Sequence, residues 1–226
     1  MFEAVLFDWR GTLFTDEAEL DWIRNAATSI GRVLSDDEAA SILEQGEAVL
    51  RERRDLQVAL DRSDVSVEAH RSATLAWLRA AGLDDELAIA IWARDGHPDA
   101  SFPFPDTAPV LRDLHVRGIR VAIVSDIHYD LRDHFAHHGL AEFVDAYVLS
   151  YAHGCQKPDA EMFELALDAL GVTSDRALMV GDRASHDGGA AAIGIATFIL
   201  PSLGHTSSVR PRGLDAVLRL VGTSAG

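Results

Sequence analysis

Cysteine is nearly absent from this chain of 226 residues, and Cys155 is the only one. A single cysteine cannot form an intramolecular disulfide, which excludes the disulfide-rich class of small secreted proteins and favours a reducing compartment. The sequence also lacks an apolar run of the roughly 18–20 residues that a membrane-spanning helix needs. It passes at once into a strand-like segment, so we expect no signal peptide. We therefore expect a soluble, cytoplasmic protein without membrane partners.

Lysine is as scarce as cysteine, because Lys157 is the only lysine beside 19 arginines. Arginine carries a planar fork of donors whereas lysine is a compact point charge, so a site built around an ammonium would not accept arginine instead. Chance also explains the position of one lysine. The scarcity becomes informative only through the motif that contains Lys157.

Positive charge as a whole is short: 20 basic residues stand against 36 acidic ones, which gives a formal net charge of −16. Such a surface repels nucleic acid and anionic lipid, so we expect neither as a partner. It would also repel a small phosphate group, so any phosphate site must be made locally positive by a bound cation or a well-placed lysine. The composition leaves monomer and homodimer both open.

Short apolar runs alternate with helical patterns over much of the chain, of which 48% is hydrophobic. Runs typical of buried parallel strands lie at residues 4–7, 119–124, 146–149, 177–180 and 195–200. Helical periodicities lie at residues 107–117, 129–138, 159–170, 185–193 and 214–221. Strands that alternate with helices predict a doubly wound α/β core with a mostly parallel, Rossmann-like sheet.

Residues 16–98 interrupt this alternation. The segment has no strand candidate and consists of amphipathic helical stretches at residues 17–30, 36–54, 66–81 and 84–94. A proline-rich stretch from Pro98 to Pro109 follows and is typical of a linker. We therefore predict an α/β core formed by residues 1–15 and 99–226, and an inserted all-α domain at residues 16–98.

Polar side chains stand where the predicted strands end. Asp8 follows the first strand, within Phe7-Asp8-Trp9-Arg10-Gly11-Thr12, and Ser125-Asp126 follows the second. Another strand ends at Gly181-Asp182, with Asp187 five residues later, and Lys157 precedes a helix in Gln156-Lys157-Pro158-Asp159. Ligands of open parallel sheets bind beyond the carboxyl ends of the strands. Carboxylates suit Mg²⁺, while a hydroxyl and an ammonium suit phosphate oxygens.

This constellation resembles the haloacid dehalogenase superfamily. That family carries D-x-D-G-T as its first motif, a Ser or Thr after a strand as its second, a Lys as its third and G-D-x-x-x-x-D as its fourth. The likeness extends over residues 156–194, with Lys-Pro-Asp, Met-Phe-Glu, Val-Gly-Asp and Gly189-Ala190. Because the long gap lies between the first and second motifs, the resemblance implies a helical cap there and none between the second and third.

The resemblance implies a Mg²⁺-dependent hydrolase, a phosphatase of small phosphorylated metabolites. Asp8 would attack phosphorus in line and form an aspartyl-phosphate that water then hydrolyses. Asp8, Asp182 and the backbone carbonyl of Arg10 would ligate Mg²⁺. Asp187 would belong to the same site, where it would orient Lys157 or a metal-bound water.

A phosphate-binding set is implied as well. Lys157 would neutralise charge between the nucleophile and the phosphoryl group, and Ser125, followed by Asp126, would hydrogen-bond a transferring oxygen. The backbone at Gly11 and Thr12 would offer its amides to the phosphate, which requires small, flexible residues. Ser125 and Asp187 also suit a purely structural role as helix caps.

Position 10 departs from the family pattern. In family phosphatases the second Asp of the first motif protonates the leaving oxygen and then activates water. Arg10 stands there instead, and a guanidinium with a pKa above about 12 cannot do that work near neutral pH. General acid–base help is worth about 10²–10⁴-fold, so its loss predicts slower turnover with phosphate binding retained.

Three interpretations of Arg10 stay open. The substrates have leaving groups that need no protonation, and Arg10 takes a catalytic part by stabilising the leaving anion. Another group, His128 or a residue of the insert, supplies the proton. Alternatively, the chain is a phosphate-binding, regulatory protein with little turnover.

A haloacid dehalogenase is a further alternative, because dehalogenases of the superfamily also lack that Asp and usually carry Tyr there. Those metal-free enzymes have a Ser where this chain has Asp182. A carboxylate at that position repels a carboxylate substrate unless a cation lies between them. Asp182 therefore favours metal and phosphate over halide.

Three histidines, His134, His137 and His138, share one predicted helix, and an i, i+4 pair of histidines can bind zinc. No cysteine or acidic set completes such a site in the sequence. The preferred interpretation is a solvated helix face.

Overall fold

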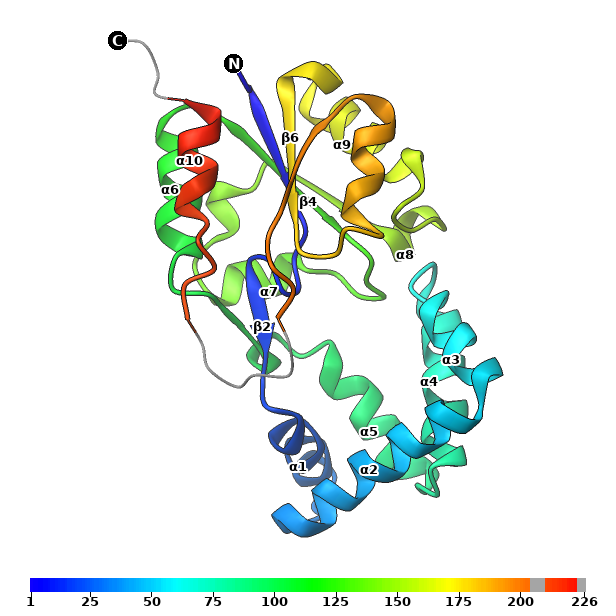
Figure 1. The fold of residues 1–226 in the computed structure, drawn as a ribbon. Helices are drawn as coiled ribbons and strands as arrows, with labels where there is room; N and C mark the ends of the chain where they lie inside the picture. Colours follow the sequence, from blue (N-terminus) through cyan, green and yellow to red (C-terminus); the bar gives the residue numbers. More distant parts are fainter. Residues whose placement is uncertain (204–209, 223–226) are drawn as a thin grey trace.

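A computed structural model of the protein describes residues 1–203 and 210–222. Its central sheet has five parallel strands in the order β5-β4-β1-β6-β7. The strands are β1 (Ala4–Phe7), β4 (Arg120–Ser125), β5 (Ala146–Leu149), β6 (Ala177–Gly181) and β7 (Ala196–Ile199). Each agrees with its predicted position to within one residue at either end, which confirms the doubly wound, mostly parallel core (Figure 1).

The first strand lies in the middle of the sheet, and its alternate side chains enter two different hydrophobic cores. Val5 and Phe7 pack into one core with side chains of the helices at residues 107–116, 132–137 and 215–221. Ala4 and Leu6 pack into the other core with side chains of the helix at residues 160–170. Since both faces are covered, all four positions are apolar and fully buried. The polar residue that follows, Asp8, is therefore positioned by a rigid strand.

Helices and short 3₁₀ turns connect the strands of the core. They are α6 (Thr107–Val116), α7 (Arg132–His137), η2 (Ala141–Phe143), α8 (Ser150–His153), α9 (Ala160–Leu170), η3 (Ser174–Arg176), η4 (Asp187–Ile193) and α10 (Asp215–Val221). Within the described ranges, none of the helices combines the length and apolar character needed to span a bilayer.

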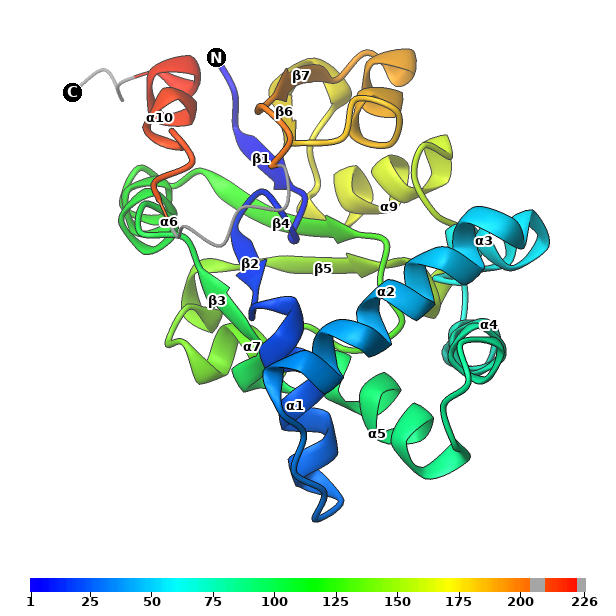
Figure 2. The same cartoon turned by 60° about the horizontal axis from the view of Figure 1, so that its bottom comes forward.

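A separate layer of helices lies beyond the edge of the sheet at which β1 ends (Figures 1 and 2). We call it the helical insert; it comprises α1 (Glu19–Ser29), α2 (Asp36–Glu52), α3 (Arg54–Asp61), α4 (Val67–Ala80) and α5 (Asp85–Asp95). These helices enclose a hydrophobic core of their own, which includes Ile23, Leu78 and Ile91. A capping box at Ser35 and Glu38 starts α2.

A two-stranded antiparallel sheet, which was not predicted from the sequence, joins the insert to the core. β2 (Phe14–Asp16) pairs with β3 (Ser101–Pro103), which follows the 3₁₀ turn η1 (Pro98–Ala100). Strands of three residues are too short to show the two-residue alternation on which the prediction relied. We call this pair the linking sheet.

Three helical predictions were wrong in detail. The single helix expected at residues 36–54 breaks at Arg53, whose φ of −106° and ψ of 77° are not helical, and α3 follows. The helix expected at 129–138 starts only at Arg132, whose backbone N–H donates to Asp130. Residues 187–193 form a 3₁₀ helix rather than an α-helix, as two consecutive glycines with low helix propensity would favour.

Candidate functional site

Two carboxylates of the core meet at a buried ammonium. Lys157 Nζ lies 2.7 Å from Asp8 Oδ1 and 2.6 Å from Asp187 Oδ1, and all three side chains are buried. Burial alone would lower the pKa of Lys157, but Asp8 and Asp187 outweigh it and raise the pKa above its usual value. The one lysine of the chain is therefore a fixed positive charge beside Asp8.

The carboxylate of Asp8 is held at both of its oxygens. Oδ1 accepts from Lys157, and Oδ2 accepts from Thr12 Oγ1 at 3.1 Å. The turn that brings Thr12 back needs a glycine, because Gly11 has a φ of +79° and a Cβ there would overlap the carboxylate of Asp182. The orientation of the Asp8 carboxylate is therefore fixed by hydrogen bonds at both oxygens.

Asp126 and Asp187 position the lysine rather than standing free. Asp126 Oδ1 accepts from the backbone N–H of Lys157 at 2.8 Å, and its Oδ2 lies 3.4 Å from an Arg183 guanidinium nitrogen. The second oxygen of Asp187 accepts from the backbone N–H of Arg183 at 2.9 Å. Ser125 is buried at the end of β4, the strand next to β1.

Asp182 completes a group of three carboxylates. Ligand atoms of Asp8, Asp182 and Asp187 all lie within 4.8 Å of one another. Burial, followed by the charges of Asp8 and Asp187, raises the pKa of Asp182 to about 6. Its Oδ1 is buried and has no hydrogen-bond partner among the described residues. A hard divalent cation such as Mg²⁺ fits this donor set, because it would occupy the orphaned oxygen and offset the surplus negative charge.

Arg10 directs its side chain away from this group. Its Nε lies 3.0 Å from Asp16 Oδ2, and its Nη2 lies 3.1 Å from Asp95 Oδ1 and 3.0 Å from the Tyr129 hydroxyl. Two of these partners, Asp95 and Tyr129, are 85 and 119 positions away in the sequence. No local sequence pattern indicates such distant contacts, so neither residue was predicted as a partner of Arg10.

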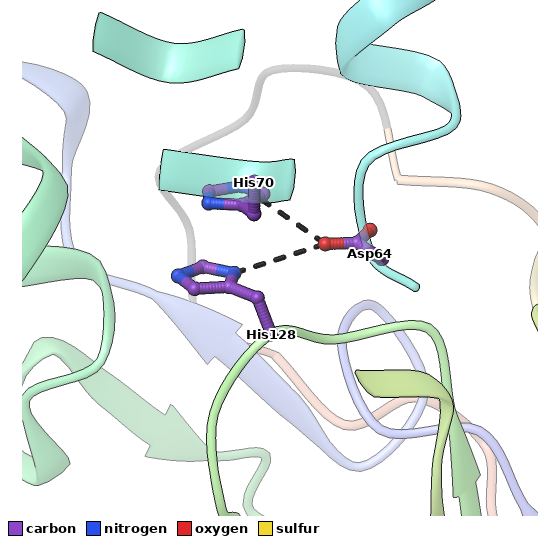
Figure 3. A group of neighbouring side chains, drawn as sticks. All are labelled: Asp64, His70 and His128. Carbon is purple, nitrogen blue, oxygen red and sulfur yellow. Dashed lines mark ion pairs between the residues drawn. The ribbon is translucent and has the colours of Figure 1, made fainter. Parts of the chain in front are cut away.

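A second cluster lies where the helical insert meets the core. Figure 3 shows Asp64 beside the rings of His70 and His128, which stack with centroids 3.4 Å apart and an interplanar angle of 6°. His128 Nδ1 and His70 Nε2 lie 3.7 and 3.9 Å from Asp64 Oδ1. Two histidines and a carboxylate are a common zinc-binding set, so the cluster is a second candidate metal site.

Hydrogen bonding argues against a metal ion in this arrangement. Trp92 Nε1, which can only donate, lies 3.1 Å from His70 Nδ1. Burial lowers the pKa of His70 to about 4, so the ring is neutral at neutral pH and its single proton lies on Nε2. The His70 nitrogen that faces Asp64 therefore has no lone pair for a metal. Because the two rings are stacked in parallel planes, their in-plane nitrogen lone pairs do not converge on one ion.

The interpretation of the later histidine helix as a solvated face was wrong for His134. This side chain is fully buried, with Nδ1 2.9 Å from Ser101 Oγ and Nε2 3.2 Å from the carbonyl of Gly96. Burial lowers the pKa of His134 to about 4, so a neutral ring accepts from Ser101 and donates to Gly96. The residue fastens α7 to the segment that leaves the insert.

Comparisons with known proteins agree with this fold. The glyceraldehyde 3-phosphate phosphatase of Methanopyrus kandleri is 27% identical over 192 residues, which cover 83% of this chain and 78% of that protein. A HAD phosphatase from Thermococcus onnurineus has a similar structure, with a TM-score of 0.66, 23% identity and 98% of both chains covered. The L-2-haloacid dehalogenase from Xanthobacter autotrophicus has a TM-score of 0.65 at 25% identity, with 90% of this chain and 79% of that chain covered.

The chain spans about half the length of several relatives that it matches, between 38% and 59%. A family model described as haloacid dehalogenase-like hydrolase matches residues 2–194. That range includes Asp8, Ser125, Lys157, Asp182 and Asp187. This chain belongs to the haloacid dehalogenase-like hydrolase family.

Proposed function

We propose that the protein is a Mg²⁺-dependent phosphohydrolase of small phosphorylated metabolites, with Asp8 as its nucleophile. The observation that carries this proposal is the orphaned Oδ1 of Asp182 beside an Asp8 carboxylate held at both oxygens. A dehalogenase needs no cation, whereas a group of three carboxylates with one ammonium is short of positive charge. Relatives named as phosphatases of glyceraldehyde 3-phosphate and of phosphoserine support the same class of substrate.

In the first step an oxygen of Asp8 forms a bond to phosphorus while the bond from phosphorus to the leaving oxygen breaks, and the leaving group departs with that electron pair. In the second step the oxygen of a water molecule forms a bond to phosphorus while the bond from phosphorus to Asp8 breaks, which restores the free carboxylate. One proton of the water stays on the released phosphate, and the other goes to solvent and balances the proton that the leaving group takes up. Lys157 holds positive charge beside the nucleophile throughout both steps. Ser125 and the backbone at Gly11 and Thr12 would contact the phosphoryl oxygens.

Asp8, Asp182 and the backbone carbonyl of Arg10 would hold Mg²⁺, and Asp187 would orient Lys157 beside it. When bound, the cation supplies charge neutralisation for the phosphoryl oxygens. Since Lys157 and the backbone of Arg183 already engage both oxygens of Asp187, this residue has less freedom to ligate than Asp182.

The helical insert would act as a cap on the site. It belongs to the division expected from the sequence, with a core at residues 1–15 and 99–226 and a cap at residues 16–98. A cap of this kind excludes bulk water and supplies contacts that select the substrate. The cap would take no part in the bond-breaking steps, which the residues at the strand ends would carry out.

Arg10 favours one alternative, a phosphate-binding regulatory protein with little turnover. The side chain of Arg10 is engaged by carboxylates and a hydroxyl and offers no acid–base group. A protein of this kind would bind a beryllium fluoride mimic of the phosphoryl group with Mg²⁺ and still not hydrolyse any phosphate ester.

The test is hydrolysis of an aryl phosphate and an acyl phosphate with Mg²⁺, and again after EDTA. We expect turnover that EDTA abolishes, and a loss of at least about 10³-fold for Asp8→Asn because the nucleophile is gone. Asp133→Asn, which changes an exposed carboxylate of α7, is the matched control and should be unchanged. Metal-independent chloride release from 2-chloropropionate would instead establish a dehalogenase.

A further inference from the structure

Arg10 connects three separate parts of the fold to the loop that carries the nucleophile. Asp16 ends β2 of the linking sheet, Asp95 ends α5 of the helical insert, and Tyr129 lies in the loop after β4. The Cα of Arg10 is only two residues from that of Asp8. A change in the position of the insert therefore acts on this loop through one side chain.

The surroundings of Arg10 suit carboxylates of the protein better than an anionic substrate. Burial would lower the pKa of Arg10, but Asp16 and Asp95 outweigh it and raise the pKa well above its usual value. The adjacent cavity of about 200 Å³ is also lined by Glu17 and Glu19. A phosphate group or leaving anion would meet acidic walls there, which argues against direct contact between Arg10 and substrate.

Asp95, the partner of Arg10 in the helical insert, also lies near a second basic residue of the core. Asp95 Oδ2 lies 3.7 Å from His128 Nε2, while the other ring nitrogen of His128 faces Asp64 at 3.7 Å. Burial would raise the pKa of Asp95, but Arg10 and then His128 outweigh it and lower the pKa. Asp95 is thus held as a charged group against the core by residues from two loops.

We infer that the Arg10–Asp95 ion pair is a latch that holds the helical insert closed over the site, and that Arg10 is a positioning residue. The guanidinium keeps α5 against the nucleophile loop and so fixes the loop that contains Gly11 and Thr12. The latch itself does not depend on the proposed function. Its effect on turnover rests on that function.

A separate contact holds the two ends of the insert together when the latch is broken. Glu17 accepts two hydrogen bonds from Arg94, at 2.6 and 2.8 Å, and both side chains are mostly buried. This pair joins the start of the insert to its end, one residue before Asp95. An Arg10 variant should therefore stay folded and open the insert as a rigid layer.

The experiment measures the distance between insert and core directly. Nitroxide labels are placed at Val33→Cys in the insert and Val116→Cys in α6, which are 91% and 77% exposed, in a Cys155→Ser background. Pulsed electron resonance then gives the distance distribution. We expect one narrow distribution for the parent protein and a longer, broader one for Arg10→Met and for Asp95→Asn.

Controls separate a latch from general loss of charge. Arg32→Met removes an arginine that pairs with Asp84 and Glu86 inside the insert, and it should leave the distribution unchanged. If Arg10 and Asp95 act as a pair, the double variant should be no more open than Arg10→Met alone. Arg10→Lys, which keeps the charge but not the fork, should give an intermediate distribution. An unchanged distribution in Arg10→Met would overturn the latch.

Turnover provides the second measurement. With the proposed function, Arg10→Met should lower kcat/KM about tenfold for a sugar phosphate, which is large enough to contact the insert. The loss for the smaller acetyl phosphate should be less. Equal losses for both substrates with an unchanged distance distribution would mean that Arg10 acts on the phosphoryl group itself. If no variant or parent hydrolyses any phosphate, the proposed function fails while the distance measurement still decides the latch.

Discussion

Two places in this molecule set a basic side chain between carboxylates, and they differ in burial and in what they join. Lys157 is fully buried between Asp8 and Asp187, and all three residues belong to the α/β core. The Arg10 side chain is 40% exposed, and its partner Asp95 belongs to a different layer of the fold. The first is a fixed centre suited to chemistry, whereas the second is a contact that can open.

The neighbouring carboxylates show the same difference. The pKa of Asp182 is raised to about 6 by burial and by Asp8 and Asp187, so this group carries an excess of negative charge that a cation would offset. The pKa of Asp95 is lowered because Arg10 and His128 outweigh its burial. The core site is therefore built to receive positive charge, and the latch already contains it.

The largest expected effect comes from replacing the two basic residues in turn. Lys157→Met leaves Asp8 and Asp187 buried without their cation, so we expect unfolding free energy to fall by about 3–5 kcal/mol. Arg10→Met should cost under about 1 kcal/mol, because a partly exposed ion pair is screened by water. Urea unfolding of both variants measures the contrast, and similar losses would contradict the distinction between fixed centre and latch.

A smaller effect, opposite in sign at the two sites, is expected from Asp182→Asn and Asp95→Asn in EDTA. Folding raises the pKa of Asp182, so the parent protein loses stability as pH rises from about 4 to about 6. At pH 7 the free energy of unfolding of Asp182→Asn should therefore exceed that of the parent by about 1 kcal/mol. The lowered pKa of Asp95 contributes stability above its unfolded pKa, which is lost as pH falls through the folded value. Asp95→Asn should therefore be less stable at pH 7, and shifts of the same sign would refute the comparison.

The two regions also differ in how far the sequence foretells them. Asp8 and Asp182 could be placed at one edge because apolar runs mark β1 and β6, and parallel strands end at the same edge. The contact from Arg10 to Asp95 could not, since it depends on how a whole layer of helices docks on the core. The linking sheet was not predicted for a simpler reason: strands of three residues are too short to show a two-residue hydrophobic periodicity.

A requirement for glycine explains why residues 187–193 form a 3₁₀ helix and not the predicted α-helix. Residues 187–193 have the apolar spacing of a helix, yet a Cβ at Gly189 would lie 2.6 Å from the carbonyl of Pro158. The close approach of the Lys157 loop therefore requires glycine, and glycine weakens the α-helix. The site determines the local conformation here, which a pattern of hydrophobic residues does not reveal.

Asp8 is tested as the nucleophile most directly by a rapid acid quench of a single turnover on an aryl phosphate that carries radioactive phosphorus, with Mg²⁺ present. We expect label on the peptide that contains Asp8, and none after Asp8→Asn or in EDTA. Complete hydrolysis without label on that peptide at any time, or label on another residue, would contradict it.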